Sequence, residues 1–387
     1  MHFREPGLTH KEDFATGTGA AALGGITLVF DMPNTNPPVA TVEVFEEKRA
    51  LVEPNARVDF GLFGILLQEN VDQVEGIAEA GAIGFKLFMG ETTGNNPCPD
   101  DAAIFAHFRR IAKAGALAAV HAENNAMLQT LKAELRASGR RDPRAHLDSR
   151  PWFVEAEAIS RATAMAAGAG NRLHVVHVST RQGLDRVRMA RREGTRVTCE
   201  ALISHLLFDD SAYERHGNLA MVNPPIRERE HSQALWAGLR AGEIDLVATD
   251  HAPHALEEQT REDVWQGVGG FGGVELLLPL LLTQAAEGKL ALEDVVRLTS
   301  QGPARVYGLY PRKGSLAIGS DADFALVDLD ANWTVDEAKL HAKHRISPFH
   351  GWQLKGRPTA TFVRGRAVMR EGELLGSPSG RLVRPLA

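Results

Sequence analysis

Cysteine is scarce in this sequence, which contains only Cys98 and Cys199 among 387 residues. Two cysteines cannot build a disulfide framework, and such usage is typical of a reducing compartment. No apolar run is long enough to span a bilayer, and there is no low-complexity tract. A charge within the first four residues is unlike a signal peptide. Together these absences predict a cytoplasmic location.

An excess of basic residues is also lacking, because the formal net charge is −6. Nucleic acids and anionic membranes are therefore poor candidates for partners, and a small-molecule substrate is favoured. The hydrophobic content of 44% and charged content of 24% are ordinary for a soluble globular protein. The length suits one large domain with a smaller one.

Short apolar runs, alternating with segments of helical spacing, are the main pattern that the sequence contains. Such alternation predicts a parallel sheet with helices on its faces. The helical segments include residues 12–25, 100–115 and 181–194. Seven strands are expected within residues 25–32, 57–66, 82–89, 115–123, 172–180, 196–203 and 244–252.

An eight-stranded α/β barrel of the TIM type, (β/α)8, needs one strand more than these seven. We expect "MHFREPG" to be the carboxyl end of a truncated first strand, with most of that strand absent. After residue 310 the helical period gives way to β alternation with glycine turns. The predicted domains are a barrel over residues 1–310 and a small β-rich domain over 311–387, part of a composite β-sandwich.

Charged or ligating side chains follow the predicted strands at their carboxyl ends, where such barrels keep their active sites. His2, Lys86, His121, His177 and Asp250 each end an apolar run. Any one of them could be an ordinary core residue. Five at equivalent strand ends favour a site instead.

Three imidazoles and one aspartate, with no thiolate, favour zinc or a similar divalent ion. One aspartate and neutral imidazoles cannot easily hold two dications, so an anionic bridge is needed. Lys86 lies between Phe85 and Leu87, and a buried lysine is costly unless it is neutralised. Addition of CO₂ to its amine would give a carbamate, which offers two oxygens. Two Zn²⁺ ions could then be bridged by a carbamylated lysine, for which Lys86 is a candidate.

Nine motifs in order make the chain similar to the dihydroorotases, the cyclic amidases of pyrimidine synthesis within the amidohydrolase superfamily. They cover nearly the whole length: "HFREPGLTHKEDF", "DMPNTNPP", "GFKLFMGETTG", "VHAEN", "HVVHVST", "VNPPIR", "ATDHAPH", "GVELLLPLLL" and "KGSLAIGSDADFALVD". The resemblance implies a zinc-dependent hydrolase that reversibly converts L-dihydroorotate to N-carbamoyl-L-aspartate. We expect a homo-oligomer.

The resemblance also assigns roles to individual residues. It implies that Lys86 is the carbamylated bridge, that His121 and His177 bind one metal, and that His2 and Asp250 bind the other. Asp250 would be the catalytic acid and base, moving a proton from a metal-bridging hydroxide to the leaving nitrogen.

Substrate contacts follow from the same resemblance. Arg4 and Asn34 look like a clamp for the substrate carboxylate, for which a guanidinium fork is well suited. Asn223 and His254 look like further contacts. Thr92 stands where related enzymes carry a threonine on a mobile loop over the substrate, although an ordinary surface turn is the alternative.

Two departures leave alternatives open. The family motif is His-x-His-x-Arg, and its first histidine would fall one residue before Met1. A misassigned start, with a longer natural protein, would explain this. Otherwise the chain could be a non-catalytic, dihydroorotase-like partner of aspartate carbamoyltransferase. A third alternative is a related cyclic amidase, such as a dihydropyrimidinase, hydantoinase or allantoinase, but Arg4 is not typical of these.

Overall fold

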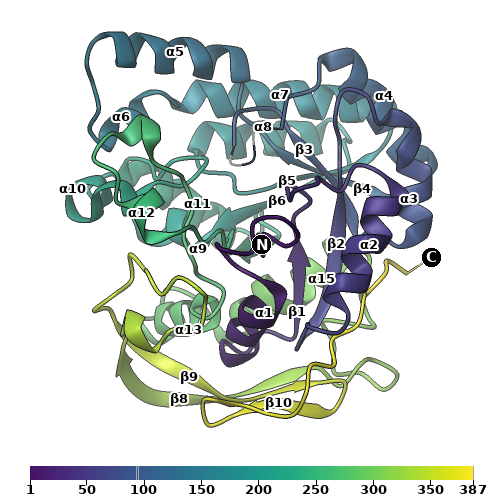
Figure 1. The fold of residues 1–387 in the computed structure, drawn as a ribbon, viewed down its shortest axis with the longest axis vertical. Helices are drawn as coiled ribbons and strands as arrows, with labels where there is room; N and C mark the ends of the chain where they lie inside the picture. The colour runs from purple at the N-terminus through teal and green to yellow at the C-terminus, as the bar shows by residue number, and fades with distance from the viewer. Residues whose placement is uncertain (93, 95, 387) are drawn as a thin grey trace.

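All seven expected runs form strands of one parallel sheet in the computed structural model, which describes residues 1–92, 94 and 96–386. The strands lie side by side in chain order and curl into a barrel-like wall (Figure 1). Their bounds are β1 (Leu28–Asp31), β2 (Asp59–Ile65), β3 (Gly84–Phe88), β4 (Leu117–His121), β5 (Arg172–Val175), β6 (Val197–Leu202) and β7 (Leu246–Ala248). The predicted fold class is therefore confirmed.

Helices between the strands cover the outer face of this sheet (Figure 1). In α8, the buried Leu184, Val187 and Ala190 recur at helical spacing, whereas its arginines face outward. The N-cap Thr180 begins that helix by accepting a hydrogen bond from the Gly183 N–H. The helices that follow the strands in this way are α2 (Val42–Val52), α3 (Val74–Ala80), α4 (Asp101–Lys113), α7 (Trp152–Ala169), α8 (Arg181–Arg192) and α11 (Arg229–Arg240).

Alternation along the strands divides the apolar residues into two packed layers. Phe60 and Leu62 of β2 pack with the helices in one cluster, whereas Phe63 belongs to a second cluster inside the barrel. Tyr307, after α15 (Gly302–Val306), joins the inner cluster with its ring centroid 5.8 Å from that of Phe63. Phe63 and Tyr307 of this inner layer also line the cavity inside the barrel.

The first residues of the chain lie between the carboxyl ends of β1 and β7. Met1 donates from its amino group to the Phe30 carbonyl (2.9 Å), and its own carbonyl accepts from Met32 (2.8 Å). The His2 N–H donates to the His251 carbonyl (2.7 Å) on the other side. Residues 1–4 form no regular strand, yet they lie where the end of the first strand was expected.

A second, antiparallel sheet follows the barrel, with the order β11-β10-β9-β8. Helices α1 (Phe14–Leu23) and α13 (Leu277–Ala286) lie between this sheet and the barrel (Figure 1), and the Thr361 hydroxyl donates to the Ala22 carbonyl (2.7 Å). Its strands are β8 (Phe324–Thr334), β9 (Gln353–Val363), β10 (Arg366–Arg370) and β11 (Glu373–Leu374). Residues 381–383 then return to β2, and the domain boundary at 310/311 stays a prediction.

The remaining helices are short or lie in the connections. None of the helices in the described ranges is long and apolar enough to cross a membrane. They are α5 (Asn125–Ala137), α6 (Arg144–Asp148), α9 (Ile203–Leu207), α10 (Ala212–His216), α12 (Leu256–Gln259) and α14 (Leu292–Val296).

Candidate functional site

One cavity at the carboxyl ends of the strands collects nearly all of the predicted site residues. Lys86 and His121 point inward from β3 and β4, and His177 and Asp250 lie just beyond β5 and β7. The lining includes the whole predicted ligand set and most of the predicted substrate contacts, namely His2, Arg4, Asn34, Lys86, Thr92, His121, His177, Asn223 and Asp250. His254 does not line the cavity and contacts Arg4 from behind.

Three of these residues have left-handed backbone conformations, which non-glycine residues rarely adopt. Arg4 has φ 61°, His177 has φ 42° and Asp250 has φ 45°. Such strain persists where the surrounding structure enforces it, and it gathers at functional sites. The backbone alone therefore marks these three positions, independently of their side chains.

Two pairs of ligating atoms face each other in the cavity. His121 Nδ1 lies 3.1 Å from His177 Nε2, and His2 Nε2 lies 3.2 Å from Asp250 Oδ1. The pairs match the predicted division of ligands between two ions. Whether they hold ions in this division stays a prediction.

The protonation states suit metal binding. Burial lowers the pKa of His2 to about 4 and lowers those of His121 and His177, so their imidazoles are neutral near pH 7. Burial opposes ionisation of Asp250, but its contact with His2 keeps the pKa of this carboxyl well below its usual range. Neutral imidazoles and a carboxylate are good ligands for divalent ions.

Lys86 lies in surroundings that disfavour its charge. Burial lowers the pKa of this amine to about 8, despite the attraction of Asp250 and Glu200. Its Nζ is 5.0 Å from the Phe88 ring centroid, and no hydrogen bond or ion pair joins it to another described residue. A neutral, unpaired amine is the form that reacts with CO₂, so the residue fits the carbamate bridge.

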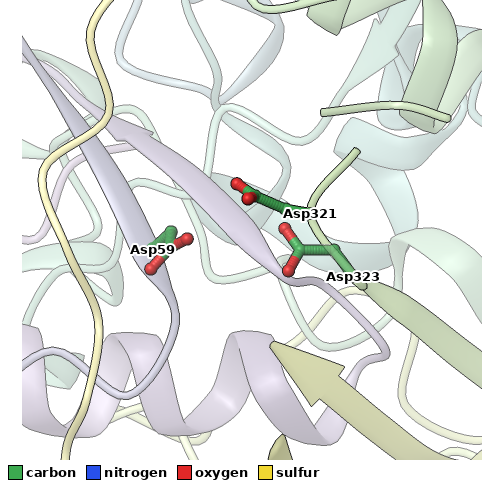
Figure 2. A group of neighbouring side chains, drawn as sticks. All are labelled: Asp59, Asp321 and Asp323. Carbon is green, nitrogen blue, oxygen red and sulfur yellow. The ribbon is translucent and has the colours of Figure 1, made fainter. Parts of the chain in front are cut away.

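An acidic cluster away from the cavity has the spacing of a metal site, but its carboxylates are already paired with cationic side chains. Asp59 at the start of β2 faces Asp321 and Asp323, which precede β8 (Figure 2). The Lys313 ammonium lies 2.6, 2.9 and 2.5 Å from their respective carboxylates, and Arg364 also contacts Asp59. The cluster is at the opposite end of β2 from the cavity. It joins the barrel to the small sheet.

Arg4 is a buried cation beside the cavity. Its Nη2 lies 3.0 Å from His254 Nε2, whereas its buried Nε has no hydrogen-bond partner in the described parts of the chain. No carboxylate in those parts forms an ion pair with it. Burial lowers the pKa of Arg4 only to about 10, so the guanidinium is charged at neutral pH. An anion bound in the cavity would balance the buried charge of Arg4.

The other predicted substrate contacts differ in whether they are already hydrogen-bonded within the chain. Asn34 Oδ1 lies 2.9 Å from His2 Nδ1, so this amide supports a ligand in addition to any contact with substrate. Asn223 Oδ1 is buried without a hydrogen bond to a described residue and is available to a ligand. Thr92 lines the cavity, but residues 93 and 95 of its loop lie outside the described residues.

Residues that the sequence did not reveal surround the site. Glu123 accepts a hydrogen bond at 2.9 Å from His121 Nε2 and is also paired with Arg150. Lys11 Nζ lies 3.1 Å from His254 Nδ1, on the far side of that ring from Arg4. Glu123 follows His121 by two residues, and this strand spacing on one face was the available signal. No comparable pattern marked Arg150 or Lys11.

Comparisons with known proteins assign the chain to a family. The model of the amidohydrolase family matches residues 1–368. An allantoinase of Deinococcus radiodurans is 40% identical over all of this chain and 86% of its own length. A dihydroorotase of Methanothermobacter thermautotrophicus is 37% identical over 97% of this chain and 83% of its own.

A solved structure is also very similar. The L-hydantoinase (dihydropyrimidinase) from Arthrobacter aurescens superposes with a TM-score of 0.97 at 36% identity, covering 99% of this chain and 86% of its own. These relatives favour a cyclic amidase without selecting dihydroorotase among them. The chain belongs to the amidohydrolase family, and it carries the fold and the strand-end cavity of a metal-dependent amidohydrolase.

Proposed function

We propose that this chain hydrolyses, reversibly, the ring amide of a small cyclic substrate that carries a carboxylate, and that L-dihydroorotate is this substrate. Arg4 supports the proposal, because its buried guanidinium faces the cavity and is paired with no carboxylate of the described residues. The guanidinium fork can donate hydrogen bonds to both oxygens of one carboxylate. The product of ring opening would be N-carbamoyl-L-aspartate.

The His121–His177 and His2–Asp250 pairs, together with Lys86, support a binuclear zinc site for this reaction. Divalent ions would supply Lewis-acid activation of water and of the ring carbonyl. His121 and His177 would hold one ion, His2 and Asp250 the other, and the carbamate of Lys86 would join them.

The residues of the chain then have separate tasks. Asp250 takes a proton from the attacking water and delivers it to the leaving ring nitrogen. Arg4 and Asn223 bind the ring and orient its carbonyl, which converts the attack into an intramolecular step. His254 supports Arg4 by contact with its Nη2.

A second candidate is hydrolysis of an uncharged ring such as allantoin or a hydantoin. The comparisons favour it, because the allantoinase shares 40% identity and the dihydroorotase 37%. In that case Arg4 would donate to a ring carbonyl or ureide oxygen.

Steady-state kinetics on four substrates separates the candidates. We expect L-dihydroorotate to be hydrolysed with a higher kcat/KM than allantoin, hydantoin or dihydrouracil. Arg4→Met should lower kcat/KM for dihydroorotate by about 100-fold or more, because it removes a buried charged partner of the carboxylate. Arg4→Lys is the control that keeps the charge. Faster turnover of allantoin or hydantoin than of dihydroorotate by the unaltered chain would establish the second candidate.

Partners are part of the same proposal. We propose a homo-oligomer, and a complex with aspartate carbamoyltransferase is the role left if the chain is not catalytic. Bound zinc and turnover would exclude a purely structural partner, whereas a chain that binds no zinc and forms that complex would support one.

A further inference from the structure

A buried ion pair stands directly behind the His121 ring. Glu123 Oε2 accepts a hydrogen bond from His121 Nε2 at 2.9 Å, and Arg150 Nη1 donates to the same oxygen. Glu123 is fully buried and Arg150 nearly so. Neither residue lines the cavity, so neither can touch a substrate there.

The contact with Glu123 decides which nitrogen of His121 is free. A carboxylate accepts only, so the proton of the neutral ring must be on Nε2. The lone pair is then on Nδ1, which is the atom that faces His177 Nε2 at 3.1 Å. A carboxylate behind the ring thus prepares the opposite nitrogen for a metal.

Arg150 holds Glu123 and is itself held by two other segments. Its Nη2 donates to the Glu91 carbonyl (3.2 Å). Its own carbonyl accepts a hydrogen bond from Arg227 Nη1. Arg150 therefore connects the Glu123 carboxylate behind His121 to a second arginine, Arg227.

That second arginine supports the segment that follows His177. Arg227 Nε donates to the Ser179 hydroxyl (3.1 Å), and Glu155 accepts from the backbone N–H groups of Ser179 and Thr180. One continuous polar network therefore runs from Glu123, behind His121, to Glu155, which binds the backbone two and three residues after His177.

We propose that Glu123 and Arg150 are positioning residues, which fix His121 in the Nε2–H tautomer and thereby set the affinity of the His121–His177 pair for a divalent ion. The inference rests on the proposed function, because it needs a metal at this pair. It requires neither dihydroorotate as the substrate nor a carbamate on Lys86.

Glu123→Leu is the sharpest variant. Both donors bond the same oxygen, Oε2, so the oxygen of a glutamine could keep both bonds, whereas leucine has a similar size and no acceptor. Without the acceptor, nothing holds the proton of the His121 ring on Nε2, and it would move to Nδ1 in part of the molecules.

Calorimetric titration of the metal-free full chain with Zn²⁺ tests the proposal. In the unaltered chain we expect two binding events. Glu123→Leu and Arg150→Met should weaken one of them by about 10- to 100-fold and leave the other unchanged. Glu157→Leu is the matched control, since Glu157 bonds the neighbouring Asn124 but is outside the network. Unchanged zinc affinity at both sites in folded Glu123→Leu would overturn the proposal.

A spectroscopic measurement covers variants that fail to fold. Two-bond ¹H–¹⁵N spectra of the metal-free, histidine-labelled chain report each tautomer, and the His121 signals are identified by their loss in His121→Gln. We expect the Nε2–H form in the unaltered chain, and an Nδ1–H form would refute the proposal. Absence of any zinc binding by the unaltered chain, with the Nε2–H form present, would instead count against the proposed function.

Discussion

At the scale of single residues, Asp250 combines two properties that a proton carrier at this site needs. It lies 3.2 Å from a histidine of the donor set, and its pKa is kept well below the ordinary range. We expect Asp250→Asn to lower kcat by at least about 100-fold, since the amide cannot accept and return the proton. Zinc content and kcat measured on the same sample check this. Loss of metal in the variant would mean that binding, rather than proton transfer, had failed.

Lys86 gives a prediction about pH. Its pKa is lowered to about 8 by burial, and only the neutral amine attacks CO₂. At constant dissolved CO₂, the rate of carbamate formation in the metal-free chain should rise with pH, with a midpoint near pH 8. The ¹³C signal of the carbamate after addition of labelled bicarbonate measures this rate. Lys86→Arg should lack the signal. A midpoint at the ordinary lysine pKa would contradict the effect of burial.

The site residues differ in whether their neighbours in the sequence could have predicted them. His121 is the last residue of β4 and Lys86 the middle residue of β3, and as polar residues in apolar runs both could be predicted to line one cavity. Arg150 comes from the segment before α7 and reaches Glu123 across 27 positions of sequence. Such a contact depends on how the connections pack, and no local pattern encodes that packing.

At the scale of secondary-structure elements, Lys313 joins β2 to the segment before β8. It is nearly buried and forms ion pairs with Asp59, Asp321 and Asp323 together. Lys313→Met should lower the free energy of unfolding by about 3–5 kcal/mol, because it leaves uncompensated carboxylates in the interior. Urea denaturation measures the loss, with the exposed Lys113→Met as control. Kinetic constants should change little, and a variant as stable as the unaltered chain would contradict the assignment.

The strands could be predicted from the sequence because each is a short apolar run with turn residues at its ends. All seven appear, and the expected helices over 100–115 and 181–194 correspond to α4 and α8. The acidic cluster around Lys313 could not be foreseen, because Asp59 and Asp323 are 264 positions apart and meet only after the barrel closes on the small sheet. The choice among cyclic amidases was also beyond the motifs, because an allantoinase and a dihydroorotase resemble the chain almost equally, at 40% and 37% identity.

At the scale of the whole molecule, the donor pairs connect distant parts of the barrel. His2 comes from the start of the chain and Asp250 from the end of β7, whereas His121 and His177 come from the middle. A metal that binds the folded chain and not the unfolded one stabilises the fold by mass action. A site built from such distant elements therefore couples metal content to global stability.

This coupling predicts how zinc acts on unfolding. With free zinc at 100 times the dissociation constant, each site should add about 2.7 kcal/mol to the free energy of unfolding. The gain should diminish as the pH falls toward 4, because protons compete for the imidazole lone pairs. Thermal unfolding with zinc or chelator, at several pH values, checks both points. His121→Gln should lose part of the gain and Lys113→Met none. A chain whose unfolding does not respond to zinc would have no functional metal site, and only a structural role would remain.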